Sequence, residues 1–155
     1  MNNNTEWFSA NRDRYNNLLK EPMKLFAAEM TERLNGMGMG ERFFPAVSRA
    51  NRDIRFSKDK SPYKDRKWVV FNYGENRWQE KCCFYFEVAP EGWCAGMGFY
   101  DAKSDYMARY RKKLSADPAG LKRLEKKLKS QDIYKTDVWM YKKKFAPEGV
   151  SEELA

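Results

Sequence analysis

The amino-acid sequence predicts an α+β fold in which a central antiparallel β-meander is flanked by helices at the N- and C-terminal ends. Apolar residues recur at helical spacing near both ends of the chain, which is typical of amphipathic helices. Strand-length segments rich in Val, Phe, Tyr and Cys fill the middle, and their connections are too short for the crossover helices that a parallel sheet requires. The length of 155 residues favours a single domain over residues 1–155, since domains typically run to about 100–150 residues.

The N-terminal stretch NNTEWFSANRDRYNNLLKEPMKLFAAEMTERLNG is predicted to be helical. Asn4 or Thr5 is a suitable N-cap, and Gly36 provides the end. Pro22 predicts either two helices or one bent helix, because proline lacks the N–H that a helix interior needs. The residues at helical spacing are Trp7, Asn11, Tyr15 and Leu18, followed by Phe26, Met30 and Leu34.

The segment GMGMGERFFP is interpreted as a flexible connector, because no strand precedes it as a glycine-rich phosphate loop would require. The alternating segment SRANRDIRFS then predicts a strand over residues 50–58. Three further strands are predicted at KWVVFNYG, EKCCFYFEVAP and GWCAGMGFYD. In the last of these, Gly96 and Gly98 share one face, so a helix, an aromatic ring or a ligand can approach the backbone closely.

The C-terminal part is predicted to be helical and basic. Asp101 is a candidate cap for the helix AKSDYMARYRKKLS, and Asp117 followed by Pro118 opens a second helix. Leu121, Leu124 and Leu128 form a narrow apolar stripe on that second helix. A short strand is expected within DIYKTDVWMY.

The composition excludes several classes of site. The chain has no histidine, so a Ser-His-Asp triad, a Cys-His pair and histidine ligands are absent. Its three cysteines, Cys82, Cys83 and Cys94, lack zinc-site spacing and are predicted to be reduced core or near-core residues. We therefore expect no metal site and no cofactor. The polar start and the lack of an apolar run of about 18 residues favour a cytoplasmic protein without membrane contact.

The stretch RANRDIRFSKDKSPYKDRK, from Arg49 to Lys67, contains eight basic and three acidic residues. As a strand, residues 50–58 would direct Ile54 and Phe56 to the core and Asp53 and Arg55 to a polar face. Pro62 would fix the geometry of the following lysine-rich turn. The stretch predicts an oxyanion-binding site, against the alternative of a solvated basic surface.

The candidate site has eight members and two further contributors. Glu87 lies in an aromatic strand, where pairing with Arg52 or Arg55 is the structural interpretation. Asn11 lies on the helical stripe and is expected to bond a strand end or a ligand. The eight members are Arg49, Arg52, Asp53, Arg55, Lys58, Lys60, Tyr63 and Lys64.

NNNTEWFSANRDRY, RANRDIRFSKDKSPYK and FYFEVAPEGWCAGMGFY together resemble the domain-of-unknown-function 2461 family. Its members are similar in an N-N-x-x-W-F-x-x-N-[RK]-x-x-Y helix start and an R-x-x-R-D-x-R-F-[ST]-x-D-K-x-P-Y-K block. The resemblance implies no catalytic residue. Family members usually carry more chain before the first block and a longer C-terminal part, so the resemblance implies a short or truncated member, which favours self-association.

Three functions remain open from the sequence. The first is binding, or enzymatic processing, of a small anionic ligand bearing phosphate or carboxylate, with Tyr63, Asp53 or Glu87 as acid–base candidates. The second is nucleic-acid binding, which the net charge of +8 and the pI near 9.3 allow, although no motif supports it. The third is a structural salt-bridge block within an interaction protein.

Overall fold

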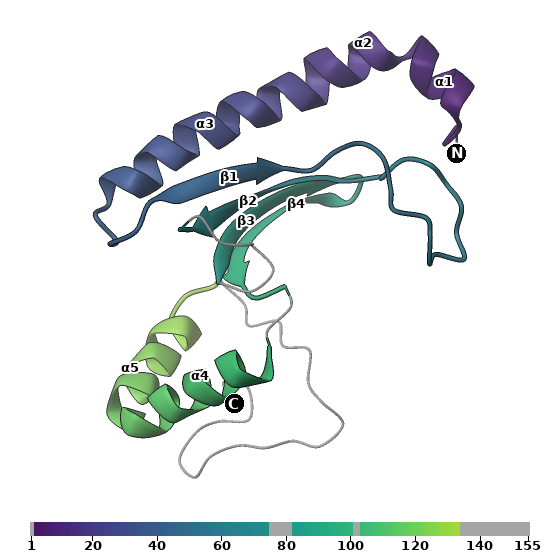
Figure 1. Ribbon diagram of the computed structural model, residues 1–155. Coiled ribbons are helices and arrows are strands. Elements are labelled where there is room, and N and C mark those ends of the chain that lie inside the picture. The colour runs from purple at the N-terminus through teal and green to yellow at the C-terminus, as the bar shows by residue number, and fades with distance from the viewer. Residues whose placement is uncertain (1, 75–81, 101–102, 134–155) are drawn as a thin grey trace. The chain divides into compact units, whose positions relative to one another are not determined.

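Four antiparallel strands form one sheet in the order β1-β2-β3-β4, as the sequence predicts for a meander (Figure 1). The strands are β1 (Phe43–Val47), β2 (Lys67–Tyr73), β3 (Cys83–Ala89) and β4 (Gly92–Gly98). The computed structural model describes residues 2–74, 82–100 and 103–133. It divides the chain into two units, residues 1–101 and 102–155, which are described separately.

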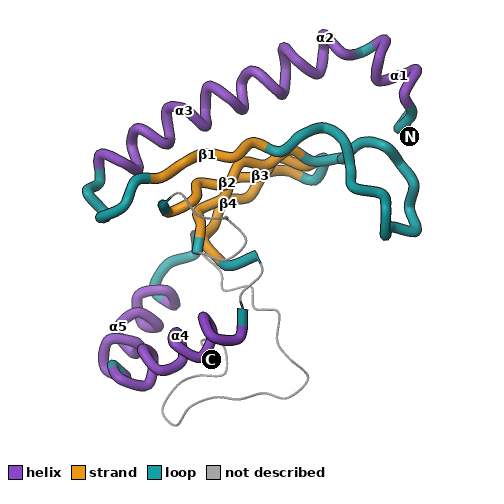
Figure 2. The backbone as a smooth tube through the Cα atoms, in the orientation of Figure 1, coloured by secondary structure: helices purple, strands orange, loops and turns teal. Residues whose placement is uncertain are grey.

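The N-terminal helical run precedes the sheet and lies along one of its faces (Figures 1 and 2). It comprises α1 (Thr5–Ala10), α2 (Arg12–Tyr15), the π-helical turn η1 (Asn16–Lys20) and α3 (Glu21–Gly36). The Asn4 side chain caps α1 by accepting from the Trp7 backbone N–H at 2.8 Å, as predicted for one of the two candidate caps.

The helical run is not interrupted at Pro22. The turn immediately before it, η1, is widened instead, and the Glu21 N–H bonds the carbonyl of Asn16, five residues back. A proline ring clashes with the carbonyl four residues before it, and the wider π-type turn relieves that clash. Pro22 then lies in the first turn of α3, where its missing N–H leaves no bond unmade.

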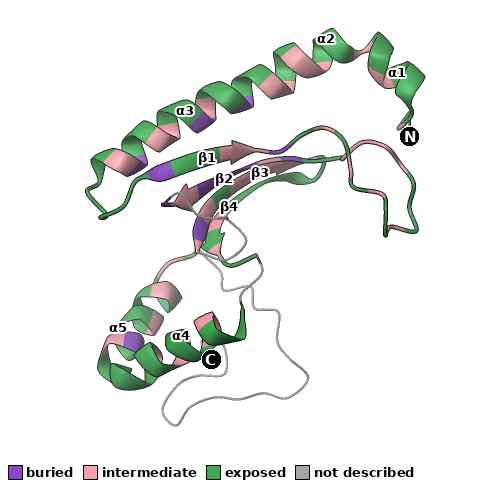
Figure 3. Ribbon diagram, in the orientation of Figure 1, coloured by how far each residue is buried: buried purple, intermediate pink, exposed green. Residues whose placement is uncertain are grey.

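The hydrophobic core lies between α3 and the sheet (Figure 3). Side chains alternate along β2, so Val69 and Phe71 face α3 and are buried with Phe43 of β1. On the helix, Met23 and Ala27 are about one turn apart and Leu34 follows about two turns later, so all three face these strand residues. The Asn35 side chain accepts from the Phe43 N–H at 2.7 Å and so ties the end of α3 to the start of β1.

The predicted strand over residues 50–58 is wrong. The segment forms only an isolated antiparallel bridge between Asn51 and Tyr63, and Phe56, expected in the core, is 95% exposed. Local bonds replace a strand ladder: the Arg55 N–H donates to the Asp53 carboxylate, and the Ser57 N–H to the Ile54 carbonyl. The first strand is β1 instead, which begins inside the segment interpreted as a connector.

The glycine-bearing strand and the cysteines are only partly as predicted. A Cβ on Gly96 would lie 2.8 Å from the Tyr85 hydroxyl oxygen and 2.9 Å from its ring, so an aromatic ring occupies the space that this glycine leaves. All three cysteines are free thiols; Cys83 is buried, Cys82 is half-buried, and Cys94 is exposed rather than near the core. Burial raises the pKa of each thiol.

The second unit contains α4 (Ser104–Ala116) and α5 (Pro118–Lys129), which contact each other. Asp117 caps α5 by accepting from the Gly120 N–H at 2.8 Å, as the Asp-Pro pair predicts. Leu121 is the buried member of the predicted leucine stripe. Asp101 and nearly all of the expected DIYKTDVWMY strand lie outside the described residues. No helix in the described part is long and apolar enough to cross a membrane.

Adjacent phenylalanines of β1 offer a matched test of the core. Phe43→Ala should lower the free energy of unfolding by about 3–5 kcal/mol, because the ring is buried against Tyr73 and Phe84. Phe44→Ala, one residue along on the exposed side, should cost about 1 kcal/mol. Urea denaturation measures both, and equal losses would contradict the assignment of the core to the α3 side of the sheet.

Candidate functional site

A cleft of about 450 Å³ opens between the first helices and the chain that enters β2. Both walls belong to the first unit of the chain. One wall comes from α1, α2 and η1, and the other from residues 49–50 and 63–67. The lining residues are Asn2, Asn3, Trp7, Phe8, Asn11, Arg14, Tyr15, Leu18, Leu19, Arg49, Ala50, Tyr63, Lys64, Asp65, Arg66 and Lys67.

The helical wall consists of two rows that follow from helical spacing. Phe8, Tyr15 and Leu19 form the inner row and are half-buried. The outer row is more exposed, apart from the half-buried Asn11. Its members are Trp7, Asn11, Arg14 and Leu18. The helical stripe predicted from the sequence therefore faces this cleft rather than a closed core.

The opposite wall is a loop that folds back on itself. The Arg52 N–H donates to the Pro62 carbonyl and the Lys64 N–H to the Ala50 carbonyl, each at 2.9 Å. These two bonds flank the bridge between Asn51 and Tyr63 and close the base of the loop. The loop base therefore has a defined geometry although it contains no regular strand.

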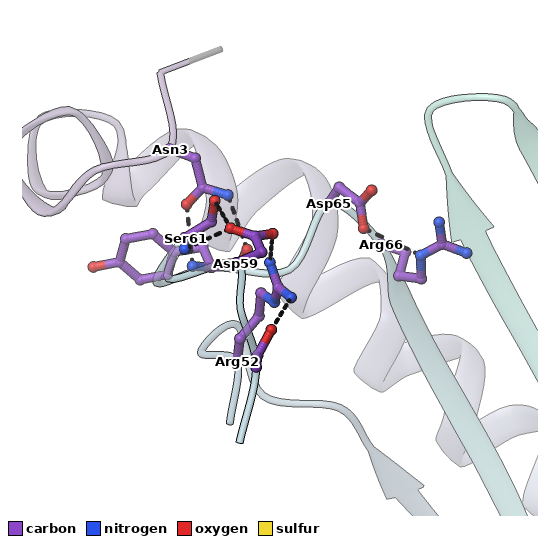
Figure 4. Close-up of polar contacts among 8 residues, drawn as sticks. Asn3, Arg52, Asp59, Ser61, Asp65 and Arg66 are labelled. Carbon is purple, nitrogen blue, oxygen red and sulfur yellow. Dashed lines mark hydrogen bonds and ion pairs between the residues drawn. The ribbon is translucent and has the colours of Figure 1, made fainter. Parts of the chain in front are cut away.

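Asn3 joins the two walls. Its carboxamide accepts from the Tyr63 N–H at 3.1 Å and donates to the Tyr63 carbonyl at 2.9 Å, so both backbone groups of Tyr63 are satisfied (Figure 4). The Tyr63 ring stacks on Phe8, with centroids 4.0 Å apart and an angle of 18° between the planes. Phe8 also contacts the Tyr15 ring at 5.2 Å. These contacts fix the distance between helix and loop.

Part of the predicted basic site is neutralised within the loop. Arg52 bonds the Asp59 carboxylate, whose other oxygen accepts from the Ser61 N–H and hydroxyl (Figure 4). The hydrogen bonds from Ser61, and then the bond from Arg52, hold the pKa of Asp59 well below its usual value. Arg52 and Asp59 thus form a closed local network within the loop.

A second pair lies at the exposed tip of the loop. Arg55 donates two hydrogen bonds to the Asp53 carboxylate, from Nε at 2.9 Å and from Nη2 at 2.6 Å. These bonds lower the pKa of Asp53 to about 2. Lys60 donates to the Ile54 carbonyl at 2.9 Å. Neither basic side chain lines the cleft.

Glu87 has a different partner from the one predicted. Arg66, and not Arg52 or Arg55, reaches the Glu87 carboxylate at 3.2 Å from its position just before β2. Arg66 also bonds Asp65 at 3.1 Å. The strand register explains this pairing, because Glu87 is opposite Trp68 in the β2–β3 ladder and therefore lies near the start of β2. Arg66 is a cleft residue whose charge is already compensated.

Lys67 is the most unusual residue of the site. It occupies the first α3-facing position of β2, in line with Val69 and Phe71, and is only 3% exposed. Its ammonium donates to the Ser48 carbonyl and to the Tyr15 hydroxyl, the latter at 3.1 Å. Neither acceptor carries a charge. Burial, with repulsion from Lys24, lowers the pKa of Lys67, and burial raises the pKa of Tyr15.

Lys64 and two arginines share this lack of a counter-charge. The Lys64 ammonium donates to the carbonyls of Arg49 and Asn51, at 3.0 and 2.6 Å. Burial and repulsion from Arg49, Lys67 and Arg52 lower the pKa of Lys64. Within the described ranges, no carboxylate pairs with Arg14, Arg49, Lys64 or Lys67. The cleft therefore collects cations that the fold leaves unneutralised.

The predicted site residues separate into two groups. Arg49, Tyr63, Lys64 and Asn11 line the cleft, and Asn11 donates to the Trp7 carbonyl at 2.9 Å rather than to a strand end. The others lie outside it. These are Arg52, Asp53, Arg55, Lys58, Lys60 and Glu87.

The sequence analysis did not predict several of the residues that line the cleft. Lys67 could have been found from alternation, because it precedes Val69 and Phe71 on the same face of a buried strand. Tyr15 and Trp7 were recognised as members of a helical stripe but were not named as site residues. Asn3 carries no periodic signal, since its contact with Tyr63 depends on a fold between distant segments.

Comparison with known proteins identifies one family. The chain matches the family model described as "Conserved hypothetical protein (DUF2461)" over residues 1–154. Searches of curated proteins and of solved structures found no match. Two of the three sequence blocks quoted for the resemblance meet at the cleft, where they contribute Asn3, Trp7, Tyr15, Tyr63 and Lys64.

The carboxamide of Asn3 gives a test of how the walls are joined. Asn3→Ala should increase amide hydrogen exchange at Tyr63 about tenfold or more, because loss of both bonds removes about 1.5 kcal/mol or more from local stability. Asn2→Ala is the matched control, as Asn2 is exposed and makes no hydrogen bond to the described residues. Unchanged amide exchange at Tyr63 in the Asn3→Ala variant would contradict the conclusion that Asn3 joins the two walls.

Proposed function

Because the chain belongs to the DUF2461 family, whose description names no activity, we propose its function from the cleft itself: it binds a small anionic ligand that carries phosphate or carboxylate. The observation that supports this proposal is the set of unpaired cations that line the cleft. Arg14 contributes from the helical wall, and Arg49, Lys64 and Lys67 contribute from the opposite wall.

A buried ammonium without a counter-charge is unfavourable, and proteins ordinarily pair such a group or shift its pKa. Lys67 has only neutral acceptors within reach, and Lys64 is bonded only to carbonyls. An anion in the cleft would supply the missing negative charge and would interact strongly, since partly desolvated charges are poorly screened.

The arginines of the loop differ in whether they pair with a carboxylate, and this difference indicates which of them can bind a ligand. Arg52 and Arg55 have carboxylate partners, whereas Arg49 has none in the described part of the chain. The guanidinium of Arg49 is thus available for a bidentate contact with phosphate or carboxylate. Arg49 and Lys64 therefore become the principal ligand-binding residues, in place of Arg55.

We propose binding and leave enzymatic processing as an extension of it. If the ligand is processed, the cleft offers Tyr15 and Lys67, which are bonded to each other, and Tyr63 as proton-transfer groups. A cytoplasmic location also remains part of the proposal, and three free thiols fit a reducing compartment. No observation favours the nucleic-acid alternative, and we do not propose it.

Two arginines of the same loop test the binding residues. Arg49→Ala should weaken phosphate binding by roughly tenfold to a hundredfold, the loss expected for a charge-assisted hydrogen-bonding group. Arg55→Ala should leave the affinity within about twofold, because its charge already pairs with Asp53. Isothermal titration calorimetry at low ionic strength measures both. Equal weakening by the two substitutions would favour a diffuse basic surface over the cleft.

The affinity for sulfate, which stays a dianion throughout, should fall as the pH rises through the pKa of Lys67. This pKa lies below the ordinary value of 10.5 in the free protein, and a bound anion raises it by stabilising the ammonium. Binding is thus strongest at pH values below the lowered pKa and weakens above it. Lys67→Met should reduce this alkaline dependence, and the part that remains reflects Lys64, whose pKa is also lowered in the same cleft. Lys113→Met, on an exposed part of α4, is the control. Identical pH profiles for wild type and Lys67→Met would exclude Lys67 from the site.

A further inference from the structure

The outer row of the helical wall contains apolar side chains that the fold leaves uncovered. Trp7 is 43% exposed and Leu18 is 68% exposed, and both line the cleft. Large apolar side chains gathered in a concave site, beside polar ones, are typical of pockets that bind organic ligands. Their placement is fixed by helical spacing, since Trp7 and Leu18 are eleven residues, or about three turns, apart.

The inner row continues this apolar surface into the cleft. Phe8 and Tyr63 stack face to face, and Leu19 lies one turn beyond Tyr15. The aromatic rings are held by contacts on both walls, so this surface is present before any ligand arrives. A preformed apolar surface binds at a lower cost in conformational entropy than one that must be assembled.

The volume of the cleft also exceeds what a bare oxyanion requires. Ligand sites of about 300–1,000 Å³ ordinarily hold whole organic molecules. The cleft, at about 450 Å³, lies within this range. The unpaired cations would bind an anionic group at one end of the ligand. The rest of the cleft lining is largely aromatic and aliphatic, which suits an organic body attached to that group.

We propose that the ligand is an amphipathic organic anion: a phosphate or carboxylate group bound by Arg49 and Lys64, joined to a flat aromatic body that packs against Trp7 and Leu18. This inference rests on the proposed anion-binding function and specifies its ligand class. The aromatic body of the ligand would stack on the Trp7 ring. Arg14 lies between Trp7 and Leu18 along the same wall, and its guanidinium would contact the anionic group or the aromatic ring of the ligand.

Paired probes separate the apolar contribution from the charge. Inorganic phosphate is compared with phenyl phosphate, and acetate with phenylacetate, by isothermal titration calorimetry on the full chain. In each pair the aromatic member should bind about tenfold or more tightly, the effect of burying a ring against Trp7 and Leu18. The pair with the higher affinities identifies the anionic group as phosphate or carboxylate.

Variants assign the preference to the named wall. Trp7→Ala and Leu18→Ala should each reduce the aromatic preference at least about threefold and leave the affinity for inorganic phosphate or acetate unchanged. Leu25→Ala is the matched control, because Leu25 is 72% exposed on α3 and lies outside the cleft. It should leave both affinities unchanged, and circular dichroism confirms folding of every variant.

The outcomes distinguish this inference from the function on which it rests. Binding of phosphate or acetate without an aromatic preference, or a preference that survives both substitutions, overturns the inference and leaves the anion-binding proposal standing. Absence of binding by all four probes overturns both. Binding of phenol as tight as that of phenyl phosphate would also overturn both, since the charge would then contribute nothing.

Discussion

The alternation of side chains along β2 is the constraint on which both the core and the candidate site depend. Val69 and Phe71 face α3 and form the centre of the hydrophobic core. Lys67 lies on the same face at the start of the strand, where its ammonium bonds the hydroxyl of Tyr15 in α2. The pairing that anchors Val69 opposite Val47 and Phe86 also fixes the position of Lys67. The register that buries the core thus also buries an ammonium at one end of it.

The distribution of counter-charges gives the basic stretch two distinct parts. Within the loop, Arg52 and Arg55 pair with Asp59 and Asp53, and these pairs organise the loop rather than stabilise the whole protein. Near the loop base, Lys64 and Lys67 have only neutral acceptors. A stretch that looks uniform in the sequence therefore combines a self-contained ion-pair network with a set of cations suited to an external anion.

The sequence predicts the elements better than it predicts their contacts. Three strands, the Asn4 cap and the Asp117–Pro118 helix start follow from local chemistry, which the neighbouring residues determine. The strand predicted over residues 50–58 fails because the Asp53 and Asp59 side chains bond the nearby backbone, and alternation alone does not reveal that competition. Of the residues predicted for the site, Asn11, Arg49, Tyr63 and Lys64 line the cleft. The contact of Asn3 with Tyr63 spans 60 residues and has no local signature.

The wide turn η1 determines which way the first helices face. Five turns of plain α-helix span about 18 residues, one fewer than the separation between Tyr15 and Leu34. The wide turn η1 accommodates this extra residue, so the side chains of Tyr15 and Leu34 lie on the same side of the helix and both face the sheet. Without this wide turn, Tyr15 would be rotated by about 100° around the helix axis, and its hydroxyl would no longer bond Lys67. The turn that relieves Pro22 thus also sets the orientation of the cleft wall relative to the core.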